Sequence, residues 1–223
     1  MTTGRLDPHR NIRISLSGEP LSSARAAMIM LHGRGASAQT AIELASSIAG
    51  SGTAIFTPQA TEFSWYPHRF IRPVAENEPF LTSALSAIGR IVTQITSAGF
   101  PTSRLIIGGF SQGACLALEY AARFPARFGG ILGFSGGLIG SEAEPLLVPH
   151  SGTPLAGSTV FLGATDHDAH IPLSRVRETA AVFLEMGAKV TTRIYPGYDH
   201  HINDDELEYA RNLVRSIITS AGK

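Results

Sequence analysis

Short apolar runs alternate with amphipathic segments along most of the chain. This alternation predicts β-strands separated by α-helices, and hence a mostly parallel central sheet with helices on both faces. The predicted strands are residues 11–16, 26–31, 53–57, 104–110, 128–133, 159–162 and 189–195. The fold class is therefore α/β.

The predicted helices between these strands have recognisable ends. Asn77 is a candidate N-cap, because a short polar side chain there can accept from free backbone N–H groups, and Asn203 or Asp204 suits the last helix in the same way. Pro172 suits the first turn of the preceding helix, where its missing N–H costs nothing. The predicted helices are residues 37–49, 78–98, 112–124 and 172–186 and a last helix that ends at residue 220.

Length and composition narrow the class of protein. We expect the 223 residues to form a single domain, 1–223, because the irregular stretches at 58–73 and 135–158 are too short for a separate lid domain. Lys plus Arg and Asp plus Glu number 18 each, and 16% of residues are charged. No net field therefore attracts nucleic acid or anionic lipid.

Cysteine content and hydropathy bear on the compartment. The single cysteine, Cys115, cannot form an internal disulfide, which suits a reducing environment. The N-terminal stretch through Arg13 is polar, and no apolar run approaches the roughly 18 residues that a membrane span needs. We expect a cytoplasmic protein without stable membrane insertion, and a homodimer is compatible with this composition.

Residues 109–113 read Gly-Phe-Ser-Gln-Gly and match the pattern Gly-x-Ser-x-Gly. The glycines of this pattern permit a tight strand-to-helix turn that lifts the serine above the sheet. Ser111 has this context, since an apolar run precedes it and an alanine- and leucine-rich helical segment follows. Ser111 is therefore the candidate nucleophile.

A second match to the pattern surrounds Ser135, at residues 133–137, and it also follows an apolar run. Here the next residues are rich in glycine and lead to Pro145 and Pro149, so a helix cannot begin after the serine. We interpret Ser135 as a turn residue without a catalytic role.

A serine hydroxyl attacks at neutral pH when an imidazole takes its proton and an acid fixes the tautomer of that imidazole. After a Gly-x-Ser-x-Gly turn, the acid and then the histidine follow along the chain, on loops at the carboxyl ends of later strands. One such loop offers Asp166 and Asp168, and the next offers His200 and His201. Each loop taken alone is equally compatible with a solvated polar turn.

Ester hydrolysis also needs donors for the oxyanion of the tetrahedral intermediate. One donor should be the backbone N–H of Gln112, beside the nucleophile. The loop Leu31-His32-Gly33-Arg34-Gly35 ends an early strand, and its glycines permit close approach, so we choose the N–H of Arg34 as the second donor. The alternative is a glycine-rich connection in which His32 is a hydrogen-bonded structural residue.

Taken together, four segments resemble the phospholipase/carboxylesterase family of small α/β-hydrolases, which includes bacterial carboxylesterases and acyl-protein thioesterases. They are the loop at 31–35, the turn at 109–113, Asp-Ala-His-Ile-Pro at 168–172 and Pro-Gly-Tyr-Asp-His-His-Ile-Asn at 196–203. The resemblance implies the α/β-hydrolase fold and no metal or organic cofactor. It also implies Asp168, which lies three residues before an Ile-Pro pair, as the acid, and His200, two residues before Ile202, as the base.

This sequence departs from the family pattern at a few positions. Ala169 stands where proline is usual, Tyr198-Asp199 replaces a smaller pair, and Arg34 occupies a position that is leucine in many thioesterases. The last two changes place charge beside the expected acyl pocket, so they affect substrate choice rather than ester chemistry.

The sequence predicts a serine hydrolase that cleaves small-molecule carboxylic esters of short to medium chain length. Acyl thioesterase or lysophospholipase activity, or a catalytically silent binding module, is the alternative. A metal site built from the His- and Asp-rich loops matches no zincin spacing, and Cys115 lies too far into the helix to replace the serine. The expected acyl wall contains Phe63, Trp65, Tyr66 and Phe70, with Leu138 and Ile139 opposite, although the aromatic residues could equally form a small core under their loop.

Overall fold

Seven strands form one sheet in the computed structural model, which describes residues 6–143, 146 and 152–220. Their order across the sheet is β1-β3-β2-β4-β5-β6-β7, and only β1 runs antiparallel to its neighbour among the paired strands. The strands are β1 (Ile14–Gly18), β2 (Ala26–Leu31), β3 (Thr53–Pro58), β4 (Leu105–Phe110), β5 (Gly130–Phe134), β6 (Thr159–Thr165) and β7 (Lys189–Tyr195).

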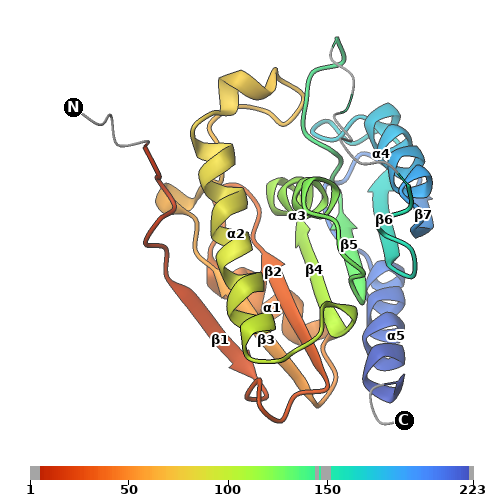
Figure 1. Cartoon of the computed structure of the whole chain (residues 1–223). Helices are drawn as coiled ribbons and strands as arrows, with labels where there is room; N and C mark the ends of the chain where they lie inside the picture. The colour runs from red at the N-terminus through yellow and green to blue at the C-terminus, as the bar shows by residue number, and fades with distance from the viewer. Residues whose placement is uncertain (1–5, 144–145, 147–151, 221–223) are drawn as a thin grey trace.

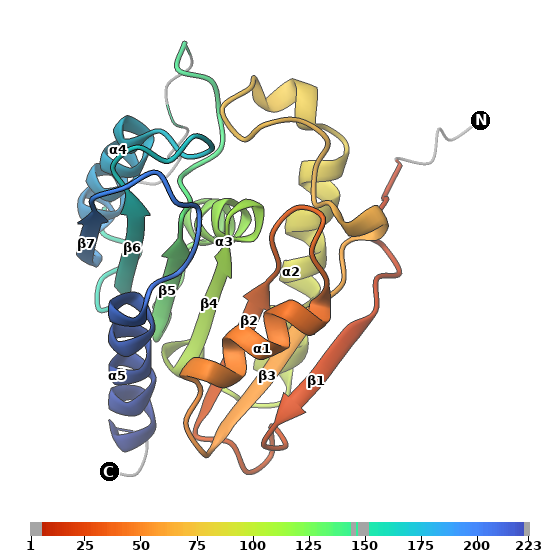
Figure 2. The same cartoon turned by 180° about the vertical axis from the view of Figure 1, so that it is seen from behind.

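Helices cover both faces of this sheet. Helices α1 and α5 contact one another on one face, whereas α2, α3 and α4 lie on the other (Figures 1 and 2). The helices are α1 (Ala38–Ile48), α2 (Phe80–Ser97), α3 (Gln112–Arg123), α4 (Leu173–Glu185) and α5 (Asp204–Ser220), with short 3-10 turns at η1 (Thr61–Phe63), η2 (Val74–Asn77) and η3 (Thr102–Arg104). None of the helices in the described ranges is long and apolar enough to cross a bilayer.

The central strands are apolar throughout because both of their faces are buried. In β2, Ile29 and Leu31 pack into the core under α2, α3 and α4, while Met28 and Met30 pack into the core under α1 and α5. Side chains of a strand alternate between the two faces of the sheet, so a strand between two helical layers needs apolar residues at every position. The predicted mostly parallel sheet is confirmed, and seven strands lie at or within a few residues of their predicted positions.

The predicted cap of α2 is wrong. The helix begins at Phe80, and Asn77 is buried in η2, where its Oδ1 accepts from the N–H of His68 and its Nδ2 donates to the carbonyl of Arg69. The carboxylate of Glu78 accepts from the N–H of Thr82 at the start of the helix instead. Asn77 therefore anchors the loop before α2 rather than the helix itself.

The cap of α5 resolves the choice between the two predicted candidates in favour of Asn203. Its Oδ1 accepts from the N–H of Glu206 at 3.1 Å, and the Glu206 carboxylate accepts from the N–H of Asn203 at 2.9 Å. This reciprocal pair satisfies two backbone N–H groups at the N-terminus of α5, directly after the loop that carries His200.

Candidate active site

Ser111 occupies a strained turn between β4 and α3. Its φ of 55° and ψ of −119° lie in a region that residues with a side chain rarely adopt. A Cβ atom on Gly109 would lie 2.5 Å from the carbonyl carbon of Gly113, and one on Gly113 would collide with the carbonyl oxygen of Leu31. Both glycines of the motif are therefore required by the close approach of three backbone segments.

The turn at Ser135 also has a positive φ, of 50°, although the sequence predicted no strained turn there. No helix follows Ser135 directly, as predicted, and the described part of the stretch 135–158 continues without one. The Ser135 side chain is buried, its Oγ has no partner among the described residues, and it does not line the pocket that contains Ser111. The two serines thus share a positive φ but differ in access to the pocket and in the helix that follows only Ser111.

Asp168 and His200 come together at the ends of β6 and β7. Asp168 Oδ2 lies 2.7 Å from His200 Nδ1, and Asp168 Oδ1 accepts from the N–H groups of His170 and Ile171 at 2.8 and 3.2 Å. The Asp168 side chain is fully shielded from solvent. A carboxylate held in this way favours the tautomer that carries its proton on Nδ1, which leaves Nε2 of His200 free.

The neighbouring candidates Asp166 and His201 lie outside this arrangement. The Asp166 carboxylate accepts from the N–H of Gly197 at 2.9 Å and contacts His167 Nδ1 at 2.7 Å, and the backbone hydrogen bond lowers the pKa of this half-buried carboxyl. His201 is exposed to solvent. Asp166 therefore joins the loop after β6 to the loop after β7 and does not contact His200.

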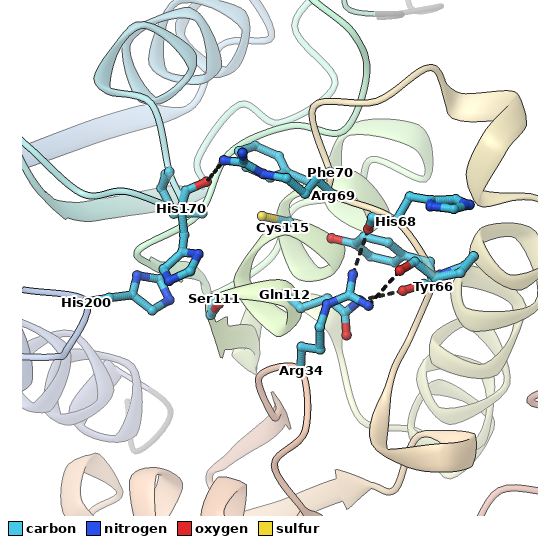
Figure 3. Close-up of a pocket in the computed structure, with 12 residues that line it drawn as sticks. Arg34, Tyr66, His68, Arg69, Phe70, Ser111, Gln112, Cys115, His170 and His200 are labelled. Carbon is cyan, nitrogen blue, oxygen red and sulfur yellow. Dashed lines mark hydrogen bonds between the residues drawn. The ribbon is translucent and has the colours of Figure 1, made fainter.

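Ser111 and His200 face one pocket of about 580 Å³ (Figure 3). No hydrogen bond joins Ser111 Oγ to His200 within the described structure, and such contacts are often long in the absence of substrate. The residues that line the pocket are Arg34, Tyr66, Pro67, His68, Arg69, Phe70, Ser111, Gln112, Cys115, His170, Ile171 and His200.

The loop after β2 lies directly beside the Ser111 turn. A Cβ atom on Gly33 would be 3.6 Å from Ser111 Cβ, and Arg34 lines the pocket together with Gln112. Within the described part of the chain, the backbone N–H groups of Arg34 and Gln112 have no hydrogen-bond acceptor. Two free donors therefore lie on segments that border the Ser111 hydroxyl.

His32 has the structural role that the alternative interpretation of this loop assigned to it. Its Nε2 accepts from the N–H of Ala60 at 3.0 Å, and its Nδ1 lies 2.8 Å from the carbonyl oxygen of Gly33. Burial lowers the pKa of its imidazole, so the ring remains neutral and holds two loops together.

Of the predicted acyl wall, only Tyr66 and Phe70 line the pocket. Phe63 is 54% exposed, and the Trp65 indole is fully buried, with its N–H donated to the carbonyl of His32. Leu138 and Ile139 are buried in the core, where their N–H groups donate to Thr179 Oγ1 and Glu119 Oε2. The assignment of these four residues to the wall is corrected, because none of them is among the residues that line the described pocket.

Cys115 packs into the hydrophobic core and also lines the pocket, a position that the sequence did not predict. The thiol is buried, and this burial raises its pKa to about 12. A thiol in this state carries almost no thiolate at neutral pH, so Cys115 is not positioned to replace Ser111 as nucleophile. Across the described ranges, no group of three or more His, Cys, Asp or Glu side chains is arranged to hold a metal ion.

Glu206 lies buried beneath the loop that carries His200. Its Oε2 accepts from Asn203, whereas its Oε1 has no partner among the described residues. The carboxyl packs against the backbone of β6, where a Cβ atom on Gly163 would collide with it. Burial raises the pKa of Glu206 to about 7.

Comparison with known proteins identifies a family and the fold. Residues 17–218 match the family model described as Phospholipase/Carboxylesterase. A crystal structure of a phospholipase/carboxylesterase from Dyadobacter fermentans is 39% identical, with a TM-score of 0.88 over 95% of this chain and 100% of that one. The Bacillus cereus carboxylesterase, at 18% identity and a TM-score of 0.72 over 93% of this chain and 95% of that one, shares the fold. The α/β-hydrolase architecture is thereby confirmed.

Curated relatives cover a smaller part of the molecule. Acyl-protein thioesterase 1 of Eremothecium gossypii is 31% identical over 69% of this chain, and that of Debaryomyces hansenii is 28% identical over 57%. These alignments span 62% and 54% of the length of the two relatives.

We predict that Glu206→Gln changes the pH dependence of stability. Because the folded pKa is raised from 4.5 to about 7, the wild-type protein loses free energy of unfolding as the pH rises from about 4.5 to above 7, where the buried carboxyl ionises. The glutamine variant lacks this loss, so its stability relative to wild type should increase by about 2 to 3 kcal/mol between pH 5 and pH 8.

Urea denaturation at several pH values measures this difference. The exposed Glu208 on the same helix provides the control, since Glu208→Gln should follow the wild-type curve. A Glu206→Gln variant with the wild-type pH profile would contradict the prediction.

Proposed function

The chain belongs to the phospholipase/carboxylesterase family, and we propose that it is a serine hydrolase which cleaves carboxylic esters through Ser111, His200 and Asp168. One observation carries the proposal: the 2.7 Å contact between Asp168 and His200 borders the same pocket as the strained Ser111 turn. Strained backbone at a pocket, beside an oriented imidazole, is the arrangement that activates a serine hydroxyl.

The reaction would proceed by acyl transfer. Ser111 Oγ attacks the ester carbonyl while His200 Nε2 takes its proton, and the buried Asp168 carboxylate stabilises the imidazolium that forms. The N–H groups of Arg34 and Gln112 donate to the oxyanion of the tetrahedral intermediate. His200 then protonates the leaving alcohol, and a water molecule activated by the same imidazole hydrolyses the acyl-enzyme.

Thioesters are a second candidate substrate class, because several curated relatives are named acyl-protein thioesterase 1. The same residues would perform this reaction, since the nucleophile, base and oxyanion donors act on the carbonyl carbon irrespective of the leaving group. Lysophospholipids are a third candidate class, but the basic side chains of Arg34, His68, Arg69 and His170 interrupt the apolar lining and so disfavour a long acyl chain. We therefore rank short to medium esters and thioesters first.

Ser111→Ala should abolish ester hydrolysis, with a loss in kcat of roughly 10⁴-fold or more, because the members of a catalytic triad act as a unit. Ser135→Ala is the matched control, since Ser135 sits at a second positive-φ turn but is buried away from the pocket. It should retain most of the activity with para-nitrophenyl butyrate, and comparable losses in the two variants would refute the assignment of Ser111.

Asp168→Asn should lower kcat by about 10³- to 10⁴-fold, because an amide favours the wrong imidazole tautomer. Asp166→Asn, in the same loop, changes a carboxylate that contacts His167 and Gly197 rather than His200, so its kcat should stay within about tenfold of wild type. Steady-state kinetics on both variants test the choice of acid, and equal losses would show that it is wrong.

Reactivity should rise with acyl length and then stop rising at about eight carbons. Each methylene that enters an apolar pocket contributes about 0.8 kcal/mol, but Arg34, His68, Arg69 and His170 interrupt the apolar lining of this one. A para-nitrophenyl ester series from acetate to palmitate measures kcat/KM directly. A value that still rises at palmitate would indicate a deeper groove.

A further inference from the structure

The pocket is rich in basic side chains although the protein as a whole has a formal net charge of zero. Two arginines and three histidines line it, and none of its described lining residues is an aspartate or glutamate. We propose that the pocket binds a carboxylate group of the substrate, so that the preferred ester carries an anionic group within reach of the ester bond. This inference rests on the proposed hydrolase function and specifies its substrate class.

Arg69 provides the most available positive charge. Its Nη2 donates to the carbonyls of Ala169 and His170 at 3.3 and 3.2 Å, and its other N–H groups have no acceptor within the described structure. The side chain is exposed and extends along the pocket toward His170 (Figure 3). A guanidinium whose hydrogen bonds are long, go to uncharged carbonyls and leave other N–H groups free is suited to bind a carboxylate.

Arg34 is the second arginine that lines the pocket, and it is held more firmly than Arg69. Its Nη1 donates to Ser64 Oγ at 3.0 Å and to the carbonyl of Pro67 at 2.8 Å, and its Nη2 donates to the carbonyl of His68 at 2.6 Å. These acceptors orient the guanidinium without neutralising it. Its position is thus set before a ligand binds, which reduces the entropy that binding would cost.

Other arginines show the pairing that these two lack. Arg72 forms an ion pair with Glu76 at 2.9 Å, only three residues from Arg69, and Arg193 pairs with Asp205. Asp168 contacts His200 of the pocket lining, but its two oxygens are occupied by His200 and by two backbone N–H groups. The Glu119 carboxylate is engaged by Arg123 and the N–H of Ile139. No described carboxylate is therefore placed to neutralise Arg34 and Arg69.

The electrostatic consequence is a local positive potential beside Ser111. Charges of one sign that line a concave site raise the local concentration of an oppositely charged substrate, and they do so less at high ionic strength. The anionic group could belong to the acyl part or to the alcohol part of the ester. Both sources present the same carboxylate chemistry to the two guanidinium groups.

Two matched substrate pairs distinguish these sources. The first compares the para-nitrophenyl monoester of adipic acid with para-nitrophenyl hexanoate, in which only the acyl end differs. The second compares O-butyryl glycolate with ethyl butyrate, in which only the alcohol part differs. The measured quantity in each pair is the ratio of kcat/KM for the anionic ester to kcat/KM for the neutral ester.

For wild type we expect a ratio of about ten or more in at least one pair, since one charge-assisted hydrogen bond to the substrate raises kcat/KM about tenfold. Arg69→Gln should reduce that ratio at least about fivefold, and added salt should reduce it in wild type. Arg34→Gln provides a second variant with the same expected direction. Arg72→Gln is the matched control, because Arg72 lies outside the pocket lining and should leave the ratio unchanged.

A wild-type ratio at or below one in both pairs would overturn the inference, and so would a ratio that neither Arg69→Gln nor Arg34→Gln reduces. Failure of the proposed function looks different. If neutral esters are hydrolysed and Ser111→Ala abolishes this activity, the hydrolase proposal stands regardless of the ratio. If no ester is hydrolysed at all, the hydrolase proposal itself fails.

Discussion

The close approach of three backbone segments around Ser111 is the constraint on which the rest of the site depends. The turn between β4 and α3 fits against the end of β2 only because Gly109 and Gly113 lack side chains. Holding Ser111 at a positive φ costs on the order of 1 to 3 kcal/mol. That cost is offset by α3, which is buried on all sides from Gln112 to Ala122 and so cannot shift to relax the turn.

The remaining groups reach Ser111 because of the direction of the strands. Arg34 follows β2, Ser111 follows β4, Asp168 follows β6 and His200 follows β7. These four strands are parallel, so their carboxyl ends share one edge of the sheet, where ligands of open α/β sheets bind. Residues far apart in the sequence therefore meet without any long loop crossing the molecule.

The sequence predicted those features that depend on residues close together in the chain, such as strands and motif turns. Continuous apolar runs predicted the buried strands, and the order of Ser111, the Asp168 loop and the His200 loop predicted which side chains would meet. The choice of Asp168 over Asp166 depended on the resemblance to a family, because both carboxylates belong to one polar loop. In the structure they differ by their partners, since Asp168 contacts the imidazole of His200 whereas Asp166 accepts from the backbone N–H of Gly197.

Predictions failed where long-range contacts decide the outcome. Asn77 has the residue type of a helix cap, yet its amide bonds to backbone groups of His68 and Arg69. The aromatic residues Phe63, Trp65, Tyr66 and Phe70 are all large enough to form either a pocket wall or a small core. Positive φ angles at Glu62 and Phe63 alter the chain direction, so Phe63 remains exposed while Trp65 is buried. No periodicity in the sequence encodes that reversal.

Polar contacts, rather than apolar packing alone, hold the wall of the pocket in position relative to Ser111. The Gln112 side chain accepts from the N–H of Trp65 at 3.0 Å and donates to the carbonyl of Tyr66 at 2.8 Å. Gln112 is also the residue after Ser111, so the wall and the nucleophile are connected through a single residue. Arg34 ties the same loop to the segment after β2. A substitution that alters the loop at 64–70 should therefore act on the geometry of the reacting groups as well as on substrate fit, because both depend on the same hydrogen bonds.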